Sequence, residues 1–243
     1  MLFHTSYFIL HTSYFMTFPT IISLGGSLVA PDGIDLAFIR TFRELVLGEV
    51  KAGKRFIITV GGGKVCRRYQ AAASELGVVH QEALDWIGIR VLSLNAELIR
   101  AIFGESAHQK VIIEPPELRT ASKPVVIFGA KAPGHSTDFD AVEAARETGA
   151  RKVVNLSNID FVYDKDPRKF PDAKKTERAT WKEFRAIIPP PEKWSPGLNS
   201  PFDPIAAKRA EELSLEVVIM NGNNLKNLED YLEGKAFKGT VIK

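Results

Sequence analysis

Glycines and charged residues gather in a stretch whose composition suits the binding of phosphate. Phe56–Arg67 reads FIITVGGGKVCR: an apolar run, three glycines and a charged segment. This order predicts a buried parallel strand, a tight turn and the start of a helix. Glycines let backbone N–H groups approach an anion, and a helix N-terminus directs partial positive charge at it. Arg67 follows Gly63 by about one helical turn, so its guanidinium can reach the same anion. Glycines required only for steric packing are the alternative.

A second glycine turn precedes this one. Thr20–Leu24 is apolar and ends at Gly25 and Gly26, and the helical spacing of apolar residues over Ile34–Lys51 follows. Two strands joined by a helix form a right-handed parallel unit. Both glycine turns are therefore expected at one edge of a sheet, at the carboxyl ends of its strands, where open α/β sheets bind ligands.

A third stretch, Gly129–Asp138 (GAKAPGHSTD), also follows an apolar run and leads into a predicted helix. Lys131 and His135 would supply charge and hydrogen bonds to a ligand. A plain helix cap from Ser136 or Thr137 explains the end of the stretch equally well. His135 alone predicts no metal site, because no second His or Cys stands at ligand spacing.

Two common nucleotide-binding motifs are missing from the sequence. Gly63 and Lys64 are followed by Val65, so there is no GxxxxGK[ST] motif, and no GxGxxG occurs either. Local support for a P-loop or a dinucleotide-binding Rossmann fold is therefore lacking.

Composition narrows the class of protein further. The chain has 243 residues, of which 45% are hydrophobic and 25% charged, with a net charge of +3. A single cysteine, Cys66, excludes an internal disulfide framework and a cysteine-based zinc site, and fits a reducing, cytoplasmic location. The mild positive charge, without any basic run, suits anionic small molecules and predicts no nucleic-acid partner.

The N-terminal segment 1–19 contains HTSYF twice, at His4–Phe8 and His11–Phe15. Its apolar residues are too few and too interrupted to span a membrane, so we expect no membrane partner. We expect a disordered tail or a segment added for expression; a role in packing or partner contact stays open.

Strands alternate with helices over the rest of the chain, which predicts an α/β fold: a three-layer αβα sandwich with a mainly parallel central sheet. The further expected strands are Val111–Ile113, Val125–Phe128, Lys152–Asn155, Glu216–Met220 and Gly239–Ile242. The further expected helices are Lys64–Glu75, Gln81–Phe103, Thr137–Glu147, Trp181–Ile187, Pro204–Glu212 and Leu225–Leu232. Ser157–Arg168 predicts a hairpin or hooked loop, and the proline-rich Ile188–Pro204 predicts irregular structure.

Six segments, in order, resemble the amino acid kinase superfamily, closest to the uridylate (UMP) kinases of archaeal type. They are LGGS at Leu24–Ser27, VGGGKVCRRY at Val60–Tyr69, DWIGI at Asp85–Ile89, PGHSTD at Pro133–Asp138, NIDFVYDKDPR at Asn158–Arg168 and FDPIAAK at Phe202–Lys208. Each segment alone is weakly specific, but together they cover the chain from Thr20 to its end. The resemblance implies ATP-dependent phosphorylation of UMP with Mg²⁺, in a homo-oligomer, a hexamer or a dimer.

The resemblance also implies roles for particular residues. The acceptor nucleotide would be bound by Gly62, Gly63, Arg67, Asp85, Lys131, Gly134, His135, Ser136 and Thr137. The ATP donor would be bound by Gly25, Gly26, Ser157, Asn158, Tyr163, Asp166 and Lys208. The catalytic group would comprise Lys64, Asp138 and Asp203, and Mg²⁺ would be held mainly by the ATP phosphates. Residues 20–150 would then form an acceptor lobe and 151–243 an ATP lobe of one fold.

Three departures from the family pattern bear on activity. Ser23 stands where many members have a lysine, so the positive charge must come from elsewhere; Lys64, Lys131, Lys165 and Lys208 are the candidates. Phe161 replaces a glycine usual in the donor loop. The third loop reads FGAKAPG where GGTHPG is frequent, and because this loop would contact the acceptor, the change bears on acceptor identity.

Two alternatives therefore remain open at this point. One is a sister kinase that acts on another small phosphate or carboxylate acceptor. The other is a non-catalytic storage protein that binds nucleotide and an oxyanion such as molybdate or tungstate, since one fold supports several functions.

Overall fold

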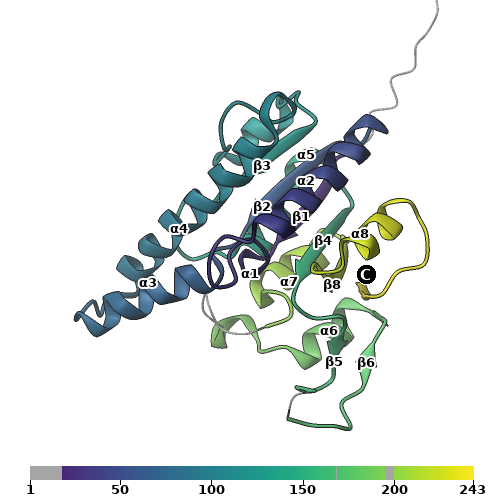
Figure 1. Cartoon of the computed structure of the whole chain (residues 1–243). Helices are drawn as coiled ribbons and strands as arrows, with labels where there is room; N and C mark the ends of the chain where they lie inside the picture. The colour runs from purple at the N-terminus through teal and green to yellow at the C-terminus, as the bar shows by residue number, and fades with distance from the viewer. Residues whose placement is uncertain (1–17, 168, 195–199) are drawn as a thin grey trace, which may run out of the picture.

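A seven-stranded sheet forms the centre of the molecule (Figure 1). The computed structural model describes residues 18–167, 169–194 and 200–243, so nearly all of the predicted 1–19 tail lies outside the described residues. The strands follow the order β3-β2-β1-β4-β8-β9-β7. Their bounds are β1 Thr20–Leu24, β2 Phe56–Val60, β3 Val125–Phe128, β4 Lys152–Ser157, β7 Arg178–Ala179, β8 Glu216–Asn221 and β9 Thr240–Ile242.

The sheet is parallel from β3 through β8, as the alternation of strands and helices predicts. The last strands differ, because β9 runs antiparallel to β8 and parallel to β7. A separate pair, β5 (Val162–Tyr163) and β6 (Lys175–Thr176), is antiparallel. A hairpin therefore begins within Ser157–Arg168 as expected, but its second strand lies beyond that range, and Arg168 itself is outside the described residues.

The helices match most of the expected ranges. They are α1 Gly26–Val29, α2 Leu36–Lys51, α3 Gly63–Glu75, α4 Gln81–Ile102, α5 Thr137–Thr148, α6 Trp181–Ile187, α7 Pro204–Glu212 and α8 Leu225–Leu232. Short 3₁₀ helices occupy Gly104–Ser106, Pro115–Arg119 and Pro191–Lys193. The four-residue α1 was not anticipated from the sequence. Nowhere in the described ranges is a helix both long and apolar enough to cross a membrane.

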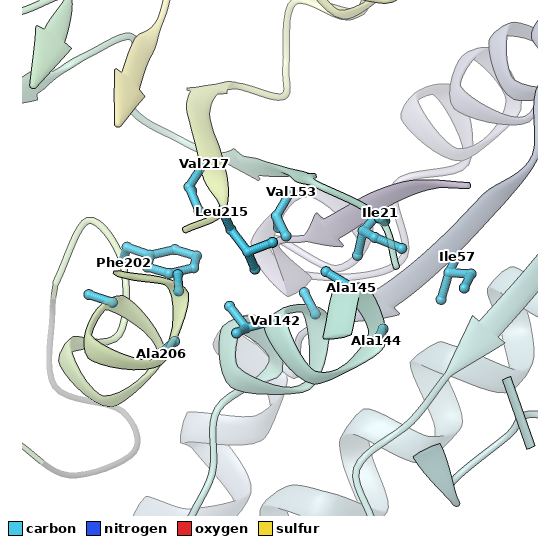
Figure 2. Packing of buried hydrophobic residues seen from close by; sticks show 14 of the residues in the cluster. Ile21, Ile57, Val142, Ala144, Ala145, Val153, Phe202, Ala206, Leu215 and Val217 are labelled. Carbon is cyan, nitrogen blue, oxygen red and sulfur yellow. The ribbon is translucent and has the colours of Figure 1, made fainter. Parts of the chain in front are cut away.

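Two hydrophobic cores, one on each face of the sheet, confirm the three-layer sandwich. Neighbouring residues of one strand point to opposite faces. Ile21 therefore packs in the core beneath α5 and α7, and Ile22 in the core beneath α2 and α4. Figure 2 shows the first core, in which Ala145 of α5 faces Ile21 and Val153 of the sheet. Strands buried on both faces explain the continuous apolar runs in the sequence.

One predicted strand, Val111–Ile113, is wrong. Only Ile112 forms an isolated parallel bridge, to Phe128 of the edge strand β3. The chain enters the 3₁₀ helix at Pro115 immediately afterwards, and proline cannot continue a ladder of hydrogen bonds.

Two helices extend well beyond the sheet. α3 and α4 lie side by side and project from the body of the molecule (Figure 1). No residue of α3 is buried. The first two turns of α3, from Gly63 to Gln70, line a pocket beside the glycine turns.

Candidate active site

The two glycine turns meet backbone to backbone. The Gly61 N–H donates to the Leu24 carbonyl over 2.9 Å, which continues the β1–β2 ladder into the turns. A Cβ on Gly61 would lie 2.7 Å from the Gly26 nitrogen. On the far side, the buried Asn95 amide donates to the Gly61 carbonyl over 2.9 Å. Both turns therefore lie at one sheet edge as predicted, and the packing itself excludes a side chain at these glycines.

A pocket opens beside these turns, between the N-terminal ends of α3 and α5 and one side of α4. Its lining residues are Gly61, Gly62, Gly63, Cys66, Arg67, Gln70, Asp85, Gly88, Ile89, Leu92, Ala130, Pro133, Gly134, His135, Ser136 and Thr137. This set contains every residue of the predicted acceptor group except Lys131. Two helix N-termini that face one pocket favour an anion in it.

Arg67 and Asp85 give the pocket its charged side chains. The guanidinium of Arg67 is exposed and forms no ion pair within the described ranges, so it is available to an anion. Asp85 accepts a hydrogen bond from Gln81 Nε2 over 2.8 Å, one helical turn earlier. A carboxylate can accept further hydrogen bonds from hydroxyl groups.

Small residues form part of the pocket wall. A Cβ on Gly88 would lie 2.9 Å from Gln70 Nε2, and one on Gly62 would collide with Cys66. Burial raises the pKa of the Cys66 thiol, although nearby Arg67 acts in the opposite direction. Cys66 therefore acts as a small neutral wall residue near neutral pH. Sequence reasoning missed Cys66, Gln70 and Gly88, because the packing of α3 on α4 brings them to the pocket.

The third loop closes the other side. The Thr59 hydroxyl donates to the Thr137 carbonyl over 3.1 Å and ties the loop to β2. The His135 ring stacks on Phe139 with centroids 4.6 Å apart and an interplanar angle of 14°. Ser136 caps α5 by accepting from the Phe139 N–H over 3.3 Å. The plain cap is therefore confirmed, and the same loop lines the pocket as well.

Asp138 lies at the centre of a buried polar network. It accepts hydrogen bonds from the Ser23 hydroxyl over 2.8 Å, the Asn155 amide over 2.7 Å and the Asp203 N–H over 3.2 Å. Burial raises the pKa of Asp138 to about 6, and the hydrogen bond from Ser23 is the largest opposing effect. The network links the ends of β1 and β4 to the start of α7.

Asp203 caps the N-terminus of α7, accepting from the Ile205 N–H over 2.7 Å. It also accepts a short hydrogen bond from the Ser136 hydroxyl of the third loop. Burial raises the pKa of Asp203, and Ser136 lowers it. Asp203 therefore joins α7 to the pocket loop without lining the pocket.

Three of the four candidate lysines form ion pairs with acidic side chains that do not line the pocket. Lys64 Nζ pairs with Asp32 at 3.1 Å, and Lys131 Nζ pairs with Glu114 at 2.8 Å. Lys165 Nζ pairs with Asp172 at 2.6 Å. Lys208 of α7 is exposed and has no ion pair among the residues that the structure describes. Neither Lys64 nor Lys131 lines the pocket.

The predicted donor residues lie outside the pocket. Gly25 donates from its N–H to the Leu156 carbonyl of β4 over 2.9 Å, which places it beside Ser157. Asn158 is exposed just beyond β4, and Tyr163 lies in β5. The Asp166 carbonyl accepts from the N–H groups of Lys169 and Phe170.

The fold and the sequence together assign this chain to a protein family. Residues 19–221 match the family model of the amino acid kinase family, and the chain belongs to that family. Uridylate kinase from Methanospirillum hungatei is 34% identical over 228 residues, covering 92% of this chain and 94% of that protein. Uridylate kinase from Thermococcus kodakarensis is 33% identical over 228 residues, covering 91% and 98%.

Solved structures agree with this assignment. The crystal structure of uridylate kinase from Archaeoglobus fulgidus has a TM-score of 0.78 and 32% identity, covering 93% of this chain and 100% of that one. The sequence resemblance and the predicted fold are thereby confirmed.

Proposed function

We propose that the chain is a uridylate kinase that transfers the γ-phosphoryl group of ATP to UMP and yields UDP and ADP. The observation that carries the proposal is the pocket in which two helix N-termini and Arg67 face Asp85, in a chain related over nearly its full length to uridylate kinases. The phosphate of UMP would lie at Gly62, Gly63 and Arg67. Its ribose would lie at Asp85, and its base near the loop from Lys131 through Gly134, His135 and Ser136 to Thr137.

The proposed reaction depends more on the positioning of the two reacting phosphates than on a general base. A phosphate oxygen of UMP forms the new bond to the γ-phosphorus while the bond to the oxygen bridging the β- and γ-phosphates breaks. Because that oxygen is already a nucleophile, orientation and neutralisation of charge carry the catalysis. Lys64 would leave Asp32 to meet the transferring group, and Asp138 and Asp203 would hold the loops in place.

ATP would bind on the other side of the paired glycine turns. Gly25 and Gly26 would receive its terminal phosphates, with Lys208 nearby. Its nucleoside would contact Ser157, Asn158, Tyr163 and Asp166. Residues 20–150 and 151–243 would then act as acceptor and donor lobes around one continuous sheet.

Mg²⁺ would enter as part of MgATP. Within the described residues, no group of three or more Asp, Glu, His or Cys side chains is arranged to hold a metal ion. With no such group in the part of the chain that the structure describes, the ion would neutralise phosphate charge while held mainly by the ATP phosphates.

A cytoplasmic location and a homo-oligomer, hexamer or dimer, complete the proposal. The exposed apolar side chains on the projecting helices, including Leu94 at 71% exposure, support association between copies.

An acceptor panel tests the proposed reaction. ATP and Mg²⁺ are incubated with UMP, CMP, AMP, small phosphates or carboxylates, and ADP formation is measured. We expect UMP to give the highest kcat/KM. Turnover of another acceptor in place of UMP would support the sister kinase. ATP binding with retained molybdate and no transfer to any acceptor would support the storage protein.

A further inference from the structure

Ser23 and Asn155 stand opposite each other at the carboxyl ends of two central strands. They are register partners on β1 and β4. Their side chains are 3% and 6% exposed, and both donate to the same oxygen, Oδ1 of Asp138. Two nearly dry side chains therefore meet the partly exposed carboxylate of Asp138, next to the Gly25 turn.

One atom of this group has no partner. Asn155 Oδ1 is buried and accepts no hydrogen bond from any residue that the structure describes. Its amide nitrogen is used by Asp138, so the orphan oxygen lies within the same cluster. Buried amide oxygens are normally satisfied, so this one is available to a group that the protein does not supply, a water or an ion.

The cluster also lacks positive charge. Asp138, Asp140 and Asp203 lie close enough for their charges to affect one another, and Asp140 Oδ2 is a second buried oxygen without a partner. Among the described residues, no Lys or Arg forms an ion pair with any of these three carboxylates, although the nearby His135 lowers the pKa of Asp203. Buried charge is normally paired or bound to a cation.

We propose that Ser23 Oγ, Asn155 Oδ1 and the Asp138 carboxylate form a binding site for a monovalent cation of the K⁺ type. The Ser23 hydroxyl keeps free lone pairs while it donates its proton to Asp138. Hydroxyl, amide and carboxylate oxygens are the ligands that hard cations prefer. Mg²⁺ gives up its water reluctantly, whereas K⁺ exchanges its hydration shell for protein oxygens. The burial of Ser23 and Asn155 therefore favours K⁺.

The catalytic consequence rests on the proposed function. A cation at Ser23 would sit beside the Gly25–Gly26 turn, where the ATP phosphates are proposed to bind. It would add positive charge at a position where Ser23 carries none.

Thermal unfolding without nucleotide tests the binding site directly. The Tm is measured while KCl replaces choline chloride in steps at constant ionic strength. A second series uses NaCl in place of KCl. The wild-type chain is expected to show a saturable rise in Tm of about 2–4 °C with KCl. Ser23→Lys, which carries its own ammonium group, is expected to lose this response. Ser93→Ala, which removes a hydroxyl on α4 that is bonded to the Ile89 carbonyl, should keep it.

An equal Tm in KCl and choline chloride for the wild type would overturn the proposal, and so would an unchanged KCl response in Ser23→Lys. If Ser23→Lys does not fold, Asn155→Leu serves as the second variant, because it removes the unpaired amide oxygen. It should abolish the rise in Tm with KCl. A retained rise would refute the site. A preparation that makes no UDP but shows the K⁺ response would contradict the proposed kinase activity and leave the cation site standing. UDP formation without a K⁺ response would contradict the cation site alone.

Discussion

The backbone of Gly26 lies so close to Gly61 that a methyl group on Gly61 would stand 2.7 Å from the Gly26 nitrogen. This contact joins the proposed donor turn to the proposed acceptor turn. The distance between the two proposed phosphate sites would then be set mainly by this main-chain contact, with the Asn95 amide holding the Gly61 carbonyl.

Gly61→Ala should separate the turns. We expect the free energy of unfolding to fall by about 1–3 kcal/mol, because the added methyl group meets backbone that cannot rotate away. The catalytic activity per folded molecule should also fall, beyond the loss that the lower fraction of folded protein explains. Gly48→Ala is the matched control, since a Cβ there meets nothing within 4 Å near the C-terminal end of α2. It should stabilise the protein by about 0.5–1 kcal/mol, measured by urea unfolding. Equal losses in both variants would refute the contact.

Arg67→Ala should weaken the acceptor site. A hydrogen bond to a charged group contributes about 1.5–3 kcal/mol, so the KM for UMP should rise by roughly 10- to 150-fold with a smaller change for ATP. Arg68→Ala is the control, because Arg68 pairs with Asp32 at 2.8 Å and does not line the pocket. Steady-state kinetics on both variants makes the comparison; a larger effect from Arg68 would contradict the assignment.

Asp85→Ala should reduce discrimination between ribose and deoxyribose. If the carboxylate accepts a hydrogen bond from the 2′-hydroxyl, the ratio of kcat/KM for UMP over dUMP should fall toward unity. The expected loss is about 10-fold or more. Glu82→Ala, on the same helix but outside the pocket lining, should leave the ratio unchanged. An unchanged ratio in Asp85→Ala would place the ribose elsewhere.

Asp140→Asn should change how stability depends on pH. Burial, followed by the charges of Asp138 and Asp203, raises the pKa of Asp140 to about 7. The folded state therefore favours the protonated acid. The resulting stability is fully present below about pH 4, the unfolded value, and is lost as the pH rises through 7.

Relative to wild type, Asp140→Asn should thus unfold at higher denaturant concentration at pH 8 and nearly the same concentration at pH 4. The gap at pH 8 should be on the order of 2–4 kcal/mol. Asp172→Asn, which changes a carboxylate 78% exposed, is the control. A pH-independent difference for Asp140→Asn would show that its carboxyl group is not protonated in the fold.

Much of the fold could be predicted from the local sequence. Trp181–Ile187 was predicted with the bounds that α6 has, and the structure shows that a capping box of Thr180 and Glu183 begins this helix. The glycine turns of the pocket were predicted because each follows an apolar run directly in the sequence. The strand at Val111–Ile113 was predicted from its apolar run, but its pairing is limited to one bridge from Ile112 to the edge strand β3, which local sequence does not reveal.

Contacts between distant segments escaped prediction. The partners of Lys64 and Lys131 depend on loop conformations that composition does not encode. Asn155 was read only as a strand residue. Its approach to Asp138 requires the β1–β4 register and the placement of α5 over the sheet.

The most direct test of the central claim is ³¹P NMR of the purified chain with UMP and MgATP. The account predicts that the UMP signal disappears as the two phosphate signals of UDP grow, in step with ADP. ATP turned over to ADP and free phosphate with UMP unchanged, or both nucleotides left intact by a folded protein, would contradict it.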